Sequence, residues 1–170
     1  MTGELLRLKD GLVALLPVAA SLMVVLVSSV PFGVPYLGPV MPSFAVAAVY
    51  YWAARRPAAL PLPATFALGL VQDSLVGSAL GQSAVILLAV QAIVGTQRRL
   101  LMAKPFHVFW FGFACLVPAA ALLHWVLDAV LEGGIPPVVP ALVQLFLTIV
   151  AFPAVAWLMA RIEHALPEPA

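Results

Sequence analysis

Apolar residues run along this chain in long stretches instead of alternating with polar residues. The stretches free of charged residues are 11–54, 57–72, 74–97, 105–127 and 133–160. A helix needs about 20 apolar residues to cross the hydrocarbon core of a bilayer. Membrane-spanning β-strands would instead alternate over roughly ten residues. The pattern therefore predicts an all-α, polytopic integral membrane protein.

The first apolar stretch is long enough for two helices, and residues 31–39 interrupt it with three prolines and two glycines. A cleavable signal peptide over 1–30 is the rival interpretation, but that stretch exceeds a usual signal core and an equally apolar segment follows. We favour a retained helix, and a single transmembrane domain over 1–170. The expected spans lie near 11–30, 40–54, 60–75, 82–97, 106–127 and 138–160.

Composition sharpens this picture. The chain is 64% hydrophobic and 9% charged, whereas soluble domains are roughly a quarter charged. Six spans use about 120 residues and leave about 50 for tails and connections. That remainder excludes a receptor ectodomain, a cytoplasmic ATPase module and a single-span anchor that carries an enzyme.

The positions of the basic residues predict the orientation. They form four groups, separated by apolar hairpins whose bends lack Lys and Arg: Arg7 and Lys9; Arg55 and Arg56; Arg98, Arg99 and Lys104; and Arg161. By the positive-inside rule, six helices with both termini in the cytoplasm fit this alternation. Asp128 and Glu132 then lie at an outer bend.

The basic groups are also candidate contact residues. Arg55 and Arg56 follow the aromatic run 50–52, and Arg98, Arg99 and Lys104 precede the aromatic-rich segment 106–110. The simpler interpretation is a topology signal with a belt of interfacial aromatic residues. The sharper one is a docking surface for anionic lipid or for a cytoplasmic partner.

Asp73 is the candidate intramembrane residue. An ionisable group at mid-membrane costs roughly 3 kcal/mol or more unless it faces protein or water. Alternatively, Asp73 caps the outer end of a short helix in the interfacial region, beside Ser74 and Gly77. Both interpretations stay open, because the prolines at 57, 61 and 63 leave the start of this helix undefined.

Three glycines share the spacing of Asp73, since Gly69, Gly77 and Gly81 follow one another around it at intervals of four. On a continuous helix these residues would share one face and allow close helix packing. For Gly77 and Gly81 we favour a turn over residues 77–83.

Few other residues suggest chemistry. His124, Asp128 and Glu132 could line a helical face that binds metal or relays protons, although a solvated helix end is the simpler interpretation. The single cysteine, Cys115, cannot form an intrachain disulfide. Phosphate-binding, zinc-protease and paired-cysteine motifs are absent from the sequence. We expect no catalytic residue, no cofactor, no metal and no nucleic-acid partner.

One set of residues resembles a known family. The elements are Pro42, the aromatic run Tyr50-Tyr51-Trp52, the string Gly69-x-x-x-Asp73-x-x-x-Gly77-x-x-Leu80-Gly81, and Arg98-Arg99. Together with the order of spans, they resemble the bacterial rod shape-determining protein MreD over essentially the whole chain. The proline-rich stretch 57–63 departs from that pattern.

The resemblance implies a non-catalytic subunit of the inner-membrane complex that builds the lateral wall. MreC would be its direct partner, with MreB, RodA and a class B penicillin-binding transpeptidase as further members of the complex. The resemblance also implies a fold similar to the S components of energy-coupling-factor transporters. Asp73 and the turn 77–81 would then border an outward-facing groove.

Two other classes compete with the scaffold. A substrate-binding S component of a vitamin transporter would need a more polar and aromatic pocket than the sequence offers. A lipid-modifying membrane enzyme would need several acids close together, whereas Asp73 stands alone in its span.

The topology gives the first testable prediction. A reporter that is active only outside the cytoplasm should work when fused after Pro35 and should fail when fused after Arg56, because basic loops are retained inside. Membrane fractionation of both fusions controls for expression. The reverse pattern of activity would refute the orientation.

Overall fold

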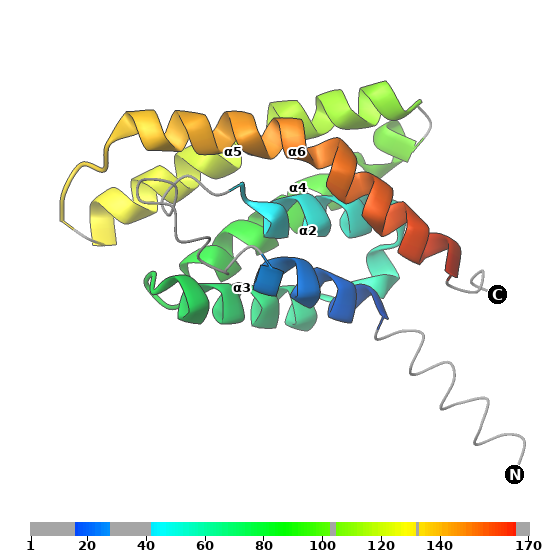
Figure 1. The fold of residues 1–170 in the computed structure, drawn as a ribbon, viewed down its shortest axis with the longest axis horizontal. Helices are drawn as coiled ribbons and strands as arrows, with labels where there is room; N and C mark the ends of the chain where they lie inside the picture. Colours follow the sequence, from blue (N-terminus) through cyan, green and yellow to red (C-terminus); the bar gives the residue numbers. More distant parts are fainter. Residues whose placement is uncertain (1–15, 28–41, 103–104, 132, 166–170) are drawn as a thin grey trace, which may run out of the picture.

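All regular structure in the described residues is helical, which confirms the all-α prediction. The computed structural model describes residues 16–27, 42–102, 105–131 and 133–165. Its α-helices are a first helix Leu16–Val27, α2 Phe44–Arg55, α3 Leu62–Val76, α4 Gln82–Met102, α5 Phe106–Leu131 and α6 Val138–Ala165 (Figure 1). A short 3₁₀ turn, η2 Pro57–Ala59, joins α2 to α3.

The helices fall where the apolar stretches predict them, with differences at their ends. The predicted break at 31–39 lies outside the described residues. Helix α4 continues past residue 97 and includes Arg98 and Arg99. The expected span near 82–97 ended before Arg98, whereas a helix can continue past a membrane boundary where long basic side chains reach water.

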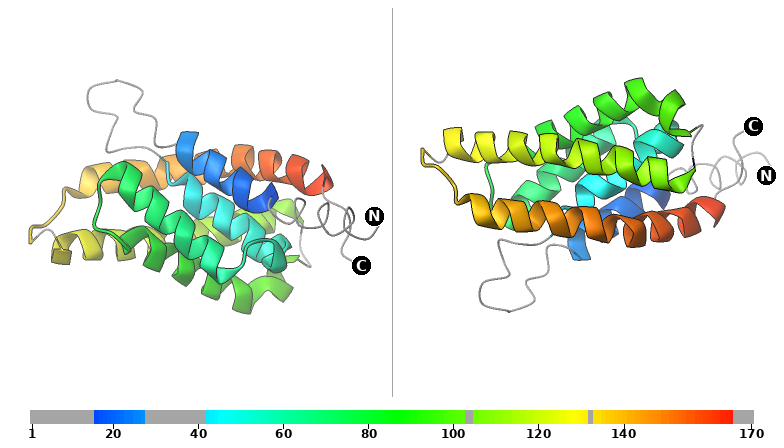
Figure 2. Two further views of the ribbon diagram at one scale, coloured as in Figure 1. Left: turned by 90° about the horizontal axis from the view of Figure 1, so that it is seen from below. Right: turned by 90° about the horizontal axis from the view of Figure 1, so that it is seen from above.

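The bundle is built in layers along one long axis. Helices α5 and α6 lie antiparallel, side by side, on one side of the bundle (Figure 2). The first helix and α3 lie on the opposite side of it (Figure 1). Helix α2 lies between, where it contacts both α4 and α6.

Helix α2 is buried on every side. All ten residues from Ala45 to Ala54 are buried, as expected of a helix that is apolar all round. Its alanines let neighbouring helices approach closely. The side chains of Tyr50, Tyr51 and Trp52 are at most 3% exposed. An interfacial aromatic belt is therefore the wrong interpretation for these three residues, because their helix faces other helices. By contrast, Phe106 and Trp110 are exposed.

An aromatic cluster joins α2 to α5 and α6. The ring centroid of Tyr50 lies 5.0 Å from that of Phe109, 5.1 Å from Phe113 and 5.5 Å from Phe152. The Tyr50 hydroxyl donates to the backbone oxygen of Phe109 at 2.9 Å. Each such ring pair adds about 0.5–1.5 kcal/mol beyond burial of its area, so the cluster fixes how the three helices pack.

The outer faces of α5 and α6 are apolar. Phe111, Phe146 and Trp157 are among their exposed side chains, at 68%, 66% and 62%. Two described segments, Phe106–Leu131 and Val138–His164, are long and apolar enough to cross a membrane, judged by length and composition. An apolar surface of this extent suits contact with lipid or protein better than contact with water.

Gly69 is the closest point of contact between α3 and α4. A Cβ atom at this position would lie 2.3 Å from Cα of Ala84 and 2.4 Å from its backbone nitrogen. Both neighbouring atoms belong to the backbone, so relief would require one helix to move. Gly69 is thus a packing residue that allows the two helices to touch.

Gly69→Ala should destabilise the bundle, by about 1–3 kcal/mol as overpacking typically does. Denaturation of the purified protein in detergent micelles would measure the loss. Gly95→Ala in α4 is the matched control, because a Cβ there meets nothing within 4 Å. Equal stability of the two variants would contradict the close approach.

Candidate functional site

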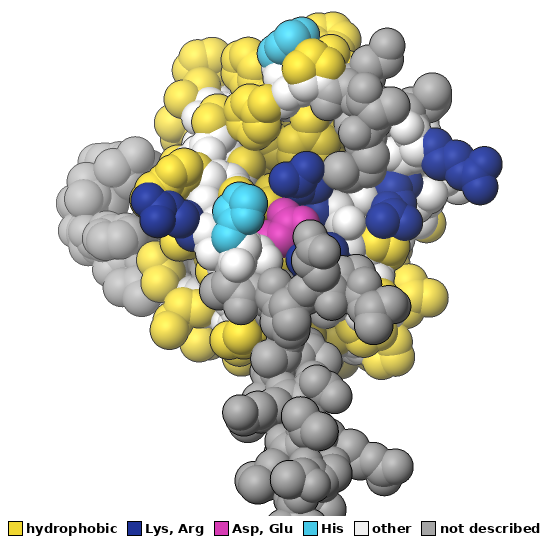
Figure 3. Space-filling model, turned by 90° about the vertical axis from the view of Figure 1, so that its right-hand side faces the viewer, with side chains coloured by type: hydrophobic (Ala, Val, Ile, Leu, Met, Phe, Trp, Pro, Cys, Tyr) yellow, Lys and Arg dark blue, Asp and Glu magenta, His cyan; other side chains and the backbone are white. Residues whose placement is uncertain are grey.

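Charged side chains gather at opposite ends of the described bundle. Helices α2, α4 and α6 finish at one end, where α5 begins. We call this end, which carries Arg55, Arg56, Arg98, Arg99, Arg161 and Glu163, the basic end. Figure 3 shows its basic side chains around an acidic one. The other end, the turn end, contains the α3–α4 turn and the C-terminus of α5.

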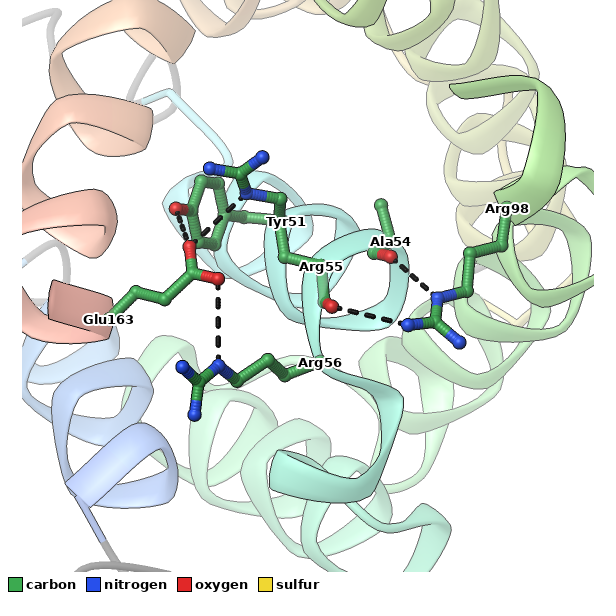
Figure 4. A network of polar contacts seen from close by, with 6 residues as sticks. All are labelled: Tyr51, Ala54, Arg55, Arg56, Arg98 and Glu163. Carbon is green, nitrogen blue, oxygen red and sulfur yellow. Dashed lines mark hydrogen bonds and ion pairs between the residues drawn. The ribbon is translucent and has the colours of Figure 1, made fainter. Parts of the chain in front are cut away.

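Glu163 organises the basic end. Its Oε2 lies 3.2 Å from Nε of Arg55, and its Oε1 lies 3.5 Å from Nε of Arg56 (Figure 4). The Tyr51 hydroxyl donates to the same carboxylate. The last turns of α2 and α6 are therefore held together. Because these side chains are partly exposed, each ion pair stabilises by at most about 1 kcal/mol.

Arg55 remains a cation in this setting. Partial burial acts to lower its pKa, while the hydrogen bond with Tyr51 and the charge of Glu163 raise it. The net pKa is raised above its ordinary value. Sequence reasoning missed Glu163, and the available signal was an acid two residues beyond Arg161 on the basic side.

Arg98 caps the C-terminus of α2. Its Nε donates to the backbone oxygen of Ala54 at 2.9 Å, and a terminal nitrogen donates to that of Arg55 at 3.4 Å. The last carbonyls of a helix lack intrahelical donors and carry partial negative charge, so a cation there is stabilising. Three candidate contact residues, Arg55, Arg56 and Arg98, thus have structural partners.

The remaining basic candidates differ from these. Arg99 is exposed on α4, and Lys104 lies outside the described residues. The guanidinium of Arg161 lies 5.2 Å from the centre of the Trp157 ring. The structure thus brings Arg55, Arg56 and Arg98 together around the end of α2.

Asp73 is completely buried in the α3–α4 turn. Its carboxylate accepts hydrogen bonds from the Ser78 hydroxyl at 3.0 Å, the Gly81 N–H at 2.8 Å and the Ser83 N–H at 3.0 Å. The two backbone donors belong to the start of α4, where N–H groups lack intrahelical acceptors and favour negative charge. Asp73 therefore caps α4, the helix that follows its own, and its charge is satisfied inside the turn.

Gly77 and Gly81 shape that turn. Both have left-handed backbone angles, with φ of 77° and 95°, which glycine adopts without strain. Gly77 ends α3 by donating its N–H to the backbone oxygen of Asp73 at 2.9 Å. The four residues spaced by four thus divide into one packing glycine, one capping carboxylate and two turn glycines.

A second polar cluster lies at the turn end. The Gln82 amide donates to Asp128, and Nδ1 of His124 lies 2.9 Å from Asp128 Oδ2. These contacts join the start of α4 to the end of α5. Glu132 lies outside the described residues, and the described residues hold no group of three or more metal-ligating side chains.

The chain matches the family model for the rod shape-determining protein MreD over residues 9–162. It belongs to the MreD family. The resemblance inferred from the sequence is confirmed, and with it a role in determining cell shape. MreD proteins are membrane proteins and are not a known enzyme family. No curated protein and no solved structure matches the chain, so the likeness to transporter S components stays a prediction.

Within this MreD-family chain, the candidate residues stabilise helix ends and turns. Asp73 holds a turn, Arg98 caps a helix, and Glu163 joins two helix ends. Each of these groups is bound to neighbouring side chains or to backbone atoms. The arrangement fixes the shape of two ends and leaves apolar flanks between them.

Asp73→Asn should weaken the turn by about 1–3 kcal/mol, because an amide would place an N–H donor against a backbone N–H. We expect intact membrane insertion but lower stability in micelles and poorer complementation of rod shape. Ser74→Ala is the matched control, since the Ser74 hydroxyl bonds only within α3, to the Leu70 oxygen. Wild-type stability and morphology in Asp73→Asn would contradict the capping role.

Proposed function

We propose that this chain is a non-catalytic, multi-pass subunit of the bacterial cell-shape complex in the inner membrane. It binds MreC directly and helps to couple MreB filaments to lateral-wall synthesis by RodA and a class B transpeptidase. Both termini and the basic end face the cytoplasm. The observation that carries the proposal is the family match over residues 9–162.

The distribution of charge supports this orientation. Among the described residues, the basic end carries five arginines, whereas Asp73 and Asp128 lie at the turn end. Cytoplasmic loops are enriched in Lys and Arg because basic segments resist translocation. The basic end is thus the side on which a cytoplasmic filament could be reached.

The flanks support a role in assembly. Helices α5 and α6 expose apolar side chains along their length, including Phe111 and Leu122 on α5 and Leu142 and Phe146 on α6. Association between helices in a membrane depends on close packing of such surfaces. A membrane partner such as MreC would meet the chain there.

The crevice formed by the described helices α4 and α5 gives little support to the vitamin-carrier alternative. A crevice of about 210 Å³ lies between α4 and α5. Pockets for compact small molecules usually measure roughly 300–1,000 Å³ and enclose most of the ligand. The crevice is smaller than that range and is open on one side, so it suits a carrier poorly.

Co-purification tests the proposal. The tagged chain, extracted from native membranes in mild detergent, should retain MreC in near-equal amount. A tagged, unrelated six-span protein at matched expression controls for non-specific capture. Retention of an ATPase pair and a vitamin, with MreC absent, would favour the transporter class and overturn the scaffold.

A further inference from the structure

The crevice between α4 and α5 has a distinctive lining. Ile93 and Gln97 line it from α4, Gly112, Cys115 and Ala119 from α5, and Tyr50 forms part of it from α2. Leu116 also lines it from α5, but Gly112, Cys115 and Ala119 are small and share one helical face, so they leave space there. Ile93 is 42% exposed and Cys115 is exposed, so the crevice opens on the side of the bundle.

The crevice lies in the half of the bundle next to the basic end. Gln97 is five residues before Met102, the last residue of α4, which corresponds to about 8 Å along the helix. Arg98 lies directly beyond it. The crevice is therefore largely apolar, and its end at Gln97 is the end nearer to the arginines of the basic end.

Arg98 follows directly after the lining residue Gln97 and lies near that end of the crevice. It follows the lining residue Val94 by one helical turn on α4. Its Nε bonds the carbonyl of Ala54, which is one turn beyond the lining residue Tyr50 on α2. These contacts use Nε and one terminal nitrogen of the guanidinium, which has five N–H donors in all (Figure 4). The guanidinium thus has donors left for a ligand placed at this end.

We propose that the α4–α5 crevice holds one acyl chain of an anionic phospholipid, whose phosphate binds Arg98. The crevice is largely apolar and open at the side, so part of an acyl chain can lie along it while the rest stays in the bilayer. Among the described residues of the basic end, five arginines accompany one acid, Glu163, and this excess of positive charge favours an anionic headgroup over a zwitterionic one. Basic sites between helices on the cytoplasmic side bind such headgroups. The proposal requires membrane insertion but does not depend on binding of MreC.

Native mass spectrometry of the purified chain, loaded with equal amounts of phosphatidylglycerol and phosphatidylcholine of matched chain length, tests the site. We expect one retained phosphatidylglycerol in clear preference to phosphatidylcholine. Arg98→Gln should reduce that preference about tenfold, because charge-assisted hydrogen bonds to phosphate are lost. Ala119→Leu should lower retention of both lipids by filling the crevice.

Arg99→Gln is the matched control. It removes one positive charge, as Arg98→Gln does. Arg99 is two residues beyond Gln97, so its side chain lies on the side of α4 that faces away from the crevice. The lipid preference of Arg99→Gln should equal that of the unaltered chain. Helix content by circular dichroism controls for loss of the α2 cap in Arg98→Gln.

Three results would overturn the proposal. The unaltered chain could retain both lipids equally, or Arg99→Gln could lower the preference as much as Arg98→Gln, which would indicate diffuse surface charge. Ala119→Leu could leave lipid retention unchanged and release a co-purified protein instead, which would assign the crevice to a partner helix.

Discussion

The enclosure of α2 by the other helices is the constraint on which the rest of the structure depends. A helix that is buried from Ala45 to Ala54 needs small side chains where neighbouring helices approach closely and large side chains that fill the space where they lie further away. Its alanines meet the first requirement, and Tyr50 meets the second through ring contacts with α5 and α6. The polar contacts of the basic end also converge on this helix, since Arg98 caps it and Glu163 binds its last turn.

Satisfaction of polar groups inside the protein explains the placement of the remaining charges. Backbone groups that a membrane cannot hydrate need partners within the protein. Arg98 supplies donors at the end of α2, and Asp73 supplies an acceptor at the start of α4. Arg98 is a basic side chain at a helix C-terminus and Asp73 an acidic side chain at a helix N-terminus, which is the arrangement that the helix dipole favours. Charged residues that suggest chemistry in the sequence therefore serve in the structure to end and to begin helices.

The all-α class was predictable from the sequence, and the described helices lie within or across the apolar segments, because hydropathy reports directly on the length of each segment. The sequence also predicted the turn at Gly77 and Gly81, where the backbone has positive φ. It could not show which span is central, and the aromatic run of α2 was therefore interpreted wrongly as interfacial. Glu163 was missed because its partners Arg55 and Arg56 are more than a hundred residues away in the chain. Whether Asp73 is buried or interfacial could not be decided from the sequence, because its hydrogen-bond donors at the start of α4 depend on how α4 packs against α3.

The central position of α2 can be tested with the tryptophans of the chain. Trp52 is fully buried on α2, whereas Trp157 on α6 is 62% exposed. Two variants that each keep one of these residues, with the other tryptophans replaced by Phe, would be placed in bilayers that contain brominated acyl chains. The structure predicts strong quenching of Trp157 fluorescence and little quenching of Trp52. Equal quenching of the two would place α2 against lipid and contradict the packing described for this MreD-family protein.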